Sequence, residues 1–248
     1  MSKFADEIRR CSRPQAQSLG FGPTRSSTGS AATMVLVGIA RDAKGAAELA
    51  KRGAAVVVIG SADRAAQTDA AGGLDAIAGA WIEGRGDDEA KRYREAGFDF
   101  VVVDPNRAAA TALLDEEVGY VMVLPADLTD AEVRALEGFQ LDALYVGAIS
   151  GTLTVRRQID LQRFFALTRK PLMALVPAGI SSTELQALRD TNVAAVAVEG
   201  GDGVEKLRKL IDALPPRTRR RDPDRPFAVV PTRAAAAAGE EDDEHEHE

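Results

Sequence analysis

The amino-acid sequence predicts a (β/α)8 barrel, in which eight parallel strands close into a ring and helices cover the outside. A unit of strand, loop, helix and strand recurs four times between Met34 and Gly200, with a period of roughly 40–50 residues. A chain of 248 residues also has the length of one such barrel, about 250 residues. The expected strands are continuous apolar runs, which is typical of parallel strands buried on both faces. They are 34–39, 54–60, 78–84, 98–104, 120–124, 141–147, 172–176 and 194–200.

Helix-like segments precede the second strand of each unit, at 47–53, 90–97, 133–139 and 185–192. Two helix starts carry the capping-box pattern, in which a hydroxyl and a carboxylate satisfy unpaired backbone N–H groups. These pairs are Thr129 with Glu132 and Ser181 with Glu184. Because such polar residues have a structural purpose, we do not count them as catalytic candidates.

The composition divides the chain into three parts. Residues 1–33 begin with a short amphipathic helix over Phe4–Cys11, which we expect to cross the barrel floor as a plug or strap. Residues 34–214 are expected to form the barrel. Residues 215–248 are basic and proline-rich at first and acidic at the end, and we expect a disordered tail because this composition cannot bury a core.

Charge and composition exclude several classes of protein. The net charge of −7 argues against a general nucleic-acid binder, which would carry a basic face. No run approaches the roughly 18 apolar residues of a membrane span, and the charged start MSKFADEIRR is not typical of a signal peptide. The single cysteine, Cys11, suits a reducing compartment and has no neighbouring histidine to activate it. We therefore expect a cytoplasmic protein without nucleic-acid or membrane partners.

Barrel enzymes place their active sites at the C-terminal ends of the strands, so the polar residues there are the candidates. Glu83 and Asp104 end two adjacent strands, and we expect them to be catalytic and to hold Mg2+, which prefers oxygen ligands. In this respect the chain resembles Mg-dependent lyase barrels. The alternative is that Glu83 pairs with Arg41, Arg85 or Arg107. Arg41 and Arg85 are themselves candidates for binding an anionic substrate, because the guanidinium group matches a carboxylate or phosphate.

The segment AGISSTELQALRDTNVAAVAVEGG, residues 178–201, resembles the last two units of aldolase-type phosphate-binding barrels. The resemblance implies that backbone N–H groups at Gly179, Gly200 and Gly201 hold a phosphate, helped by a helix N-terminus. The chain departs from the pattern, since Ala178 stands where those barrels have a first glycine. Glu199 and Asp202 flank the site and would repel phosphate unless they face away or hold a metal. Alternatively, the glycines simply form tight turns.

Missing residue types narrow the chemistry. No lysine lies on a strand or at its C-terminal end, so a Schiff-base mechanism is not expected. Both histidines, His245 and His247, lie in the tail, which leaves acid–base catalysis to Asp, Glu or Tyr145. We interpret Tyr145 first as a core or helix-facing residue. GGDGVEKL lacks the dinucleotide-binding spacing, and we find no nicotinamide, flavin or PLP signature.

Two functional hypotheses follow from these observations. The first is an aldolase-like enzyme that acts on a small anionic metabolite, phosphorylated or not, by lyase or isomerase chemistry with Mg2+. The second is a non-catalytic barrel that binds a ligand or serves as a scaffold and docks a protein partner through its charged tail. Either is compatible with a homo-oligomer, and the fold alone does not choose between them.

Overall fold

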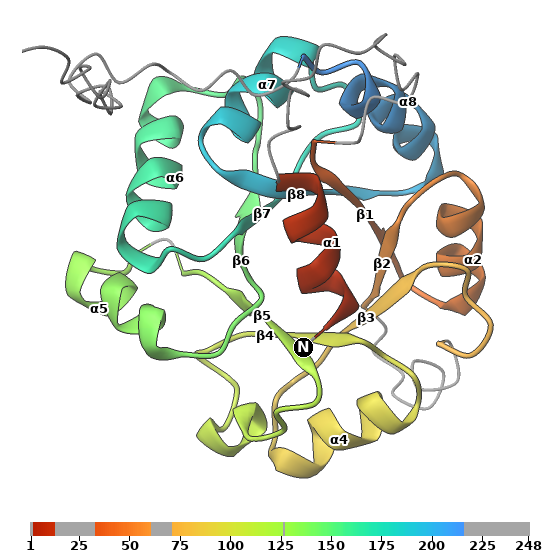
Figure 1. Ribbon diagram of the computed structural model, residues 1–248, viewed down its shortest axis with the longest axis vertical. Coiled ribbons are helices and arrows are strands. Elements are labelled where there is room, and N and C mark those ends of the chain that lie inside the picture. The colour runs from red at the N-terminus through yellow and green to blue at the C-terminus, as the bar shows by residue number, and fades with distance from the viewer. Residues whose placement is uncertain (1, 13–32, 61–70, 126, 216–248) are drawn as a thin grey trace, which may run out of the picture. The chain divides into compact units, whose positions relative to one another are not determined.

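The computed structural model describes residues 2–12, 33–60, 71–125 and 127–215, and in it eight parallel strands close into one barrel (Figure 1). The predicted fold class is confirmed, and the strands lie in sequence order around the ring. Each strand overlaps an expected range. The strands are β1 (Val35–Ala40), β2 (Val56–Ile59), β3 (Ile77–Trp81), β4 (Phe100–Val103), β5 (Gly119–Val123), β6 (Ala143–Ala148), β7 (Leu172–Leu175) and β8 (Val193–Glu199).

The described helices of the outer layer follow the expected positions. They are α2 (Ala43–Lys51), α4 (Asp87–Glu95), α5 (Asp130–Ala135), α6 (Val155–Thr168), α7 (Ser182–Asp190) and α8 (Gly201–Asp212). Both predicted capping boxes form, at Thr129 before α5 and at Ser181 before α7. Among the described residues no helix is long and apolar enough to cross a membrane.

The connection between β4 and β5 differs from the expectation that every connection carries a helix. It holds only a single 3-10 turn, η1 (Ala110–Leu113). The first residues after β4 form a tight turn, in which the backbone N–H groups of Arg107 and Ala108 donate to the carbonyl oxygen of Asp104. Between this turn and β5, which begins at Gly119, the chain forms η1 and no α-helix.

Two apolar clusters hold the barrel together. One lies between the strands and the outer helices. The other fills the barrel interior with alternate strand residues, as the two-residue period of a strand requires. The interior cluster also contains Phe4, Ile8 and Cys11, which come from the N-terminal helix α1 (Lys3–Ser12).

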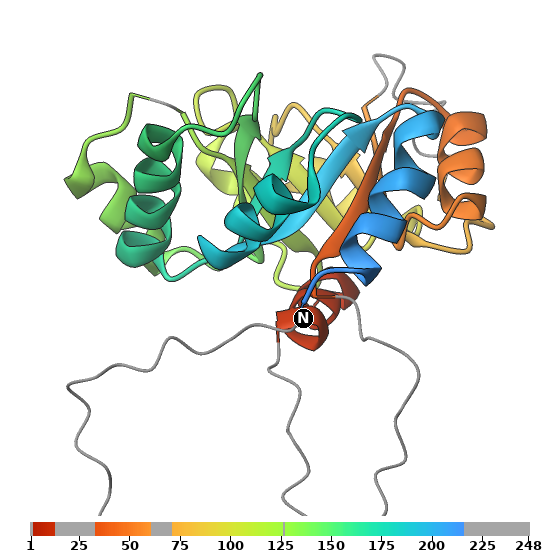
Figure 2. The ribbon, with the colours of Figure 1, turned by 90° about the horizontal axis from the view of Figure 1, so that it is seen from above.

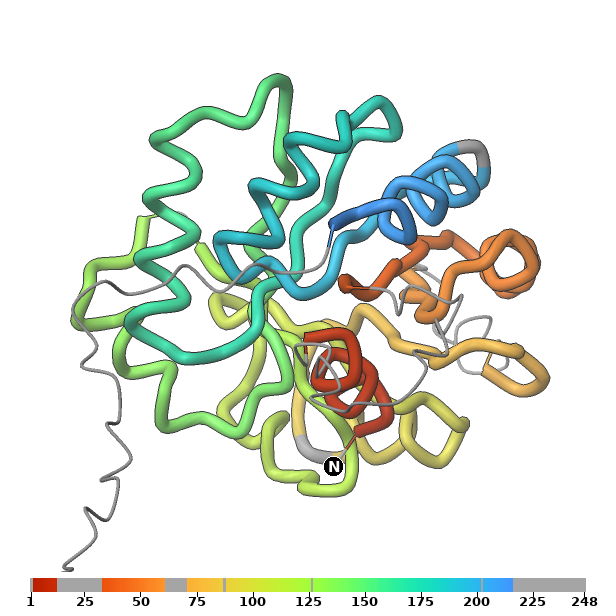
Figure 3. The backbone as a smooth tube through the Cα atoms, turned by 45° about the horizontal axis from the view of Figure 1, so that its top comes forward, coloured from red at the N-terminus to blue at the C-terminus, as the bar shows by residue number. Residues whose placement is uncertain are grey.

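Helix α1 occupies the end of the barrel where the strands begin (Figures 2 and 3). Phe4 is fully buried and stacks on Phe100, with ring centroids 4.4 Å apart. The carboxylate of Asp99 accepts hydrogen bonds from the backbone N–H groups of Lys3 and Phe4, both at 2.8 Å. The expected N-terminal plug is therefore present over residues 2–12, whereas residues 13–32 lie outside the described part of the chain.

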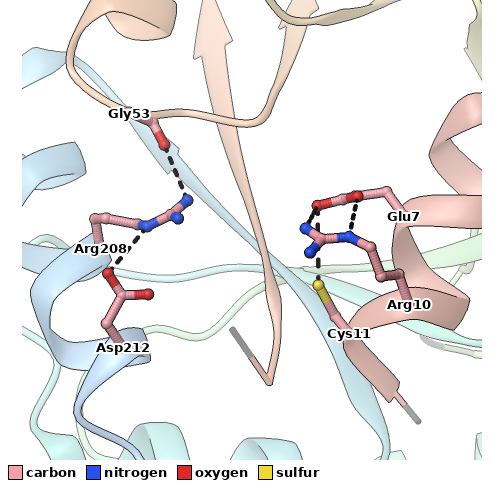
Figure 4. A network of polar contacts seen from close by, with 6 residues as sticks. All are labelled: Glu7, Arg10, Cys11, Gly53, Arg208 and Asp212. Atoms are coloured by element: carbon pink, nitrogen blue, oxygen red, sulfur yellow. Dashed lines mark hydrogen bonds and ion pairs between the residues drawn. The ribbon is translucent and has the colours of Figure 1, made fainter. Parts of the chain in front are cut away.

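The last turn of α1 carries its own polar contacts (Figure 4). Arg10 donates to Glu7 at 2.8 and 2.5 Å, and the Cys11 sulfur lies 3.9 Å from the same carboxylate. Burial raises the pKa of Cys11 to about 11, which keeps the thiol protonated and unreactive at neutral pH. Arg208 of α8 reaches the carbonyl oxygen of Gly53 nearby.

The barrel and α1 belong to one compact unit, Met1–Arg217. The tail expected from residue 215 onward lies outside the described residues from residue 216 on.

Candidate functional site

Three carboxylates extend the inward-facing rows of the barrel at its C-terminal end. Trp81, Val102 and Ala197 belong to the interior cluster. Two residues after each of them come Glu83, Asp104 and Glu199. Side chains alternate along a strand, so Glu199 of β8 belongs to the inward row, and Glu83 and Asp104 follow the ends of β3 and β4.

The acids line one cavity of about 470 Å³, which we call the mouth cavity. It brings together the two predicted catalytic residues, Glu83 and Asp104. The rest of its lining comes from β1, β3, β6 and β8 and from the residues just after β2, β3 and β4. The full set is Ile39, Gly60, Trp81, Ile82, Glu83, Asp104, Arg107, Tyr145 and Glu199.

Glu83 is engaged by its neighbour in the chain. One of its carboxylate oxygens accepts from Nε of Arg85 at 2.6 Å and lies 2.5 Å from an Arg85 Nη. Arg85 is 70% exposed and is not among the residues that line the mouth cavity. The alternative expected from the sequence, a pairing of Glu83 with an arginine, is therefore present in the structure. Glu83 nevertheless lines the mouth cavity. An ion pair this exposed is weak, so a ligand can displace it.

Close packing holds the loops after β3 and β4 together. Gly84 has φ +70°, and a Cβ atom there would lie 2.5 Å from that of Ala108. The carbonyl oxygen of Gly84 accepts from the backbone N–H of Ala109 at 2.6 Å. The Asp104 carboxylate accepts from the backbone N–H of Asn106 at 3.0 Å. This arrangement fixes the Glu83 loop beside the turn that carries Asp104.

An aromatic pair forms part of the cavity wall below the carboxylates. The rings of Trp81 and Tyr145 meet edge to face, with centroids 5.4 Å apart and planes at 86°. Tyr145 is 8% exposed, and burial together with the negative charge of Glu199 raises the pKa of its hydroxyl. The hydroxyl is thus a neutral donor at pH 7. The tyrosine lies in the barrel interior and lines the mouth cavity. Its position is therefore compatible with the role in acid–base catalysis that the sequence left open.

A second cavity of about 640 Å³ adjoins the mouth at the start of α8, and we call it the α8 cavity. The two cavities share Ile39, Gly60 and Glu199. Three predicted anion-binding residues line the α8 cavity: Arg41, Gly200 and Gly201. Asp42 also lines it, but its carboxylate accepts a hydrogen bond from the backbone N–H of Gly45 at 2.7 Å and caps the N-terminus of α2.

Gly179 does not join Gly200 and Gly201 in the α8 cavity, although the resemblance to phosphate-binding barrels grouped them. A third cavity, of about 340 Å³, is lined on this side by Pro177 and Ala178. A Cβ atom at Gly203 would lie 3.0 Å from that of Ala178, so the turn after β7 meets α8 through this contact. The departure at Ala178 therefore has a packing role.

Glu199 has a larger part in the site than the sequence pattern indicated. It lines all three of these cavities at the C-terminal end. We considered it mainly as an unfavourable neighbour of a phosphate. Ala195 and Ala197 face the barrel interior, and side chains alternate along β8, so Glu199 lies on the same inward face. This alternation would have identified Glu199 from the sequence.

The carboxylates of the mouth do not form a complete metal cage. Among the described residues, no three or more His, Cys, Asp or Glu side chains come together in a way that could hold a metal ion. Glu83 and Asp104 supply two carboxylates at most, so a Mg2+ ion would need further oxygen ligands from a substrate or water.

No family model matches this chain, and no curated protein matches it in sequence. Solved structures match it in shape. A tryptophan synthase structure from M. tuberculosis gives a TM-score of 0.57 at 12% identity, covering 75% of this chain and 93% of that chain. The 3-keto-L-gulonate-6-phosphate decarboxylase from Vibrio cholerae gives 0.60 at 15% identity, covering 74% and 99%. KGPDC from Streptococcus mutans gives 0.58 at 13% identity, covering 73% and 99%. The chain therefore shares the (β/α)8-barrel fold of these structures.

Proposed function

We propose that this protein is an aldolase-like barrel enzyme that acts on a small anionic metabolite by lyase or isomerase chemistry. One observation carries the proposal. Three strand ends place carboxylates around a single cavity, above a buried tyrosine and beside Arg107. Groups that can accept a proton, donate one and stabilise negative charge thus surround the same space.

The reaction that suits these groups begins with proton transfer from carbon. A mouth carboxylate, for which we choose Glu199, takes a proton from a carbon next to a carbonyl group, and the electron pair of that C–H bond moves to the carbonyl oxygen. Arg107 lines the same space and stabilises the resulting enolate. In an isomerisation the neutral Tyr145 hydroxyl protonates the enolate oxygen to give the enol, and the proton held by Glu199 then restores the tyrosine. In a lyase reaction the electron pair of the enolate instead re-forms the carbonyl group and expels a leaving group from the β-carbon, which departs with its bonding electrons and takes the Glu199 proton.

The anionic group of the substrate would lie in the α8 cavity. That cavity offers the Arg41 guanidinium and the glycine turn at the start of α8, where backbone N–H groups favour an anion. Because the two cavities share three residues, one molecule can reach both. A structural neighbour that is named as the decarboxylase of a 6-phosphate supports a phosphorylated substrate.

Mg2+ enters the proposal as an ion that Glu83 and Asp104 would hold together with substrate oxygens. Such an ion would supply charge stabilisation for the enolate. Its binding must compete with the Arg85 contact to Glu83.

A thermal-shift screen of sugar phosphates and their unphosphorylated counterparts, with and without Mg2+, tests the proposal. A ligand that binds only the folded chain raises Tm by mass action, and it should do so less in Glu83→Gln and Asp104→Asn. Asp127→Asn is the matched control, since Asp127 follows β5 at the same end of the barrel but lines none of the three cavities. If no compound raises Tm, the result favours the non-catalytic scaffold instead. A response that survives both mouth variants rejects the Mg2+ assignment.

A further inference from the structure

The mouth cavity and the α8 cavity share one carboxylate, Glu199, whose charge is not balanced by a neighbour. Among the described residues its side chain forms neither a hydrogen bond nor an ion pair. The other two acids of the mouth differ in this respect. Arg85 pairs with Glu83 at 2.5 Å, and the backbone N–H of Asn106 donates to Asp104 at 3.0 Å. Glu199 therefore presents a negative charge to the space where the substrate is proposed to bind.

The Tyr145 hydroxyl lies within electrostatic range of this carboxylate. Tyr145 is 8% exposed and lines the mouth cavity. Its hydroxyl forms no hydrogen bond with a described residue, and it is not one of the unpartnered atoms that are closed off from solvent. Burial and, after it, the charge of Glu199 raise the pKa of this hydroxyl. Because buried polar groups are nearly always paired, a ligand atom near both side chains would complete the hydrogen bonding of Tyr145.

Arg41 supplies the opposite charge at the α8 cavity. Arg41 and Glu199 both line this cavity but form no ion pair with each other, so the base and the acid face one space separately. Their neighbourhood follows from the pairing of β1 with β8, in which Ile39 is in register with Glu199. Of the other acids in the lining, Asp42 caps α2 and Glu48 is an exposed residue of α2. A ligand with two opposite charges could contact both Arg41 and Glu199.

The charges of the two cavities do not suit a ligand that is only anionic. Carboxylates outnumber arginines among the described residues of the lining. The five acids are Glu83, Asp104, Glu199, Asp42 and Glu48, and the two arginines are Arg41 and Arg107. Repulsion between like charges is stronger in a partly closed cavity than in bulk water. A Mg2+ ion at Glu83 and Asp104 would balance those two acids and would still leave Glu199 without a cation.

We infer that the substrate carries an ammonium group in addition to its anionic group. The ammonium group donates to the Glu199 carboxylate and to the Tyr145 oxygen, and the anionic group contacts Arg41 and the glycine turn at the start of α8. An ammonium group has three donors and no acceptor, which matches these two acceptors. A carboxylate has two oxygens, so this contact leaves one of them for the proton transfer proposed above. The inference rests on the proposed function and names the second charged group of that substrate.

Four ligands test the two charges separately: D-glucosamine 6-phosphate, D-glucosamine, D-glucose 6-phosphate and D-glucose. Isothermal titration of the full-length chain, below neutral pH so that the amine is protonated, measures each affinity. We expect glucosamine 6-phosphate to bind about tenfold or more tightly than glucose 6-phosphate, because a hydrogen bond between charged groups is gained. The comparison of each phosphate with its unphosphorylated sugar measures the anionic site independently.

Glu199→Gln should abolish the preference for the amine. The same variant should bind glucose 6-phosphate as tightly as wild type or more tightly, since a negative charge near the ligand is removed. Tyr145→Phe should reduce the amine preference several-fold, with circular dichroism to show that each variant is folded. Glu205→Gln is the matched control, because Glu205 is an exposed residue of α8 that lines neither cavity.

Three outcomes overturn the inference: equal binding of the amino and hydroxy phosphates, an amine preference that survives in Glu199→Gln, or binding of none of the four ligands. Equal binding of the two phosphates, with weak binding of both unphosphorylated sugars, would still support the anionic site proposed above. The opposite result, an amine preference without a phosphate preference, would support the ammonium site and reject the anionic one. The two proposals can therefore fail separately.

Discussion

The two ends of the barrel carry the same kind of side chain and use it differently. At the floor, Asp99 and Asp142 receive hydrogen bonds from the backbone and side chains of the first residues, Ser2 to Phe4. At the mouth, Glu83, Asp104 and Glu199 surround a cavity. A carboxylate at a strand end is therefore not by itself a sign of catalysis. What distinguishes the two ends is the helix α1, which satisfies the acids at the floor and lies at the far end from the mouth.

Glu199→Gln should have the largest effect, since it removes the carboxylate shared by the three C-terminal cavities. With a substrate identified by the thermal-shift screen, kcat/KM should fall by about a hundredfold or more, the usual range for a lost acid–base group. Steady-state kinetics measures the loss. Glu205→Gln, an exposed glutamate of α8, should behave as wild type. Equal activity in both variants would remove Glu199 from the mechanism.

Phe4→Ala should weaken the packing of helix α1 against the barrel. Phe4 is 0% exposed and stacks on Phe100, and replacing a buried phenylalanine by alanine costs about 3–5 kcal/mol. Urea unfolding followed by circular dichroism measures the change. Cys11 reports the same event, because its thiol should become reactive to alkylation in Phe4→Ala before global unfolding. If the loss stays under ~1 kcal/mol, well below the cost expected for this change, α1 is not part of the core.

Gly84→Ala should distort the mouth without touching its acids. The new Cβ would lie 2.5 Å from that of Ala108, and the backbone has the positive φ that disfavours alanine. We expect about 1–3 kcal/mol of destabilisation and weaker ligand binding at the mouth. Gly138→Ala, where a Cβ atom meets nothing within 4 Å, is the matched control. Unchanged stability would show that the two loops can separate freely.

Asp142→Asn should have the smallest effect. It tests the contribution of the barrel floor, the end where the strands begin, to the pH dependence of stability. Burial raises the pKa of Asp142 in the folded chain, so the folded state holds this proton more tightly than the unfolded state. The stabilisation is complete below the unfolded value of about 3.9 and is lost as pH rises through the higher folded value. The variant should therefore lose less stability than wild type as pH rises from about 3.5 to 6. Parallel curves from urea unfolding would contradict the raised pKa.

Much of the fold follows from short stretches of sequence, whereas little of the site does. The strands begin close to their expected positions, because apolar runs and helix start signals act locally. Thr129 and Ser181 show this, since both capping boxes form as the sequence requires. Among the described connections, the one between β4 and β5 departs from this pattern, because it holds only the 3-10 turn η1. For the site, the sequence placed Glu83 and Asp104 at the ends of adjacent strands, and both line the mouth cavity.

Four other relations were decided only by the structure. Arg85 pairs with Glu83 and stays outside the mouth cavity, and Gly179 lies apart from Gly200 and Gly201. Tyr145 faces the interior, and Glu199 reaches all three cavities described at the C-terminal end.

The sequence by itself determined that eight buried strands are joined by helix-length connections and that an amphipathic helix precedes them. Both are properties of residue periodicity, which needs no distant contact. Only the tertiary structure decided which polar ends share a cavity. The reason is closure: β1 pairs with β8 and brings Ile39 beside Glu199, from opposite ends of the barrel sequence. No local pattern encodes that neighbourhood, and the candidate site lies within it.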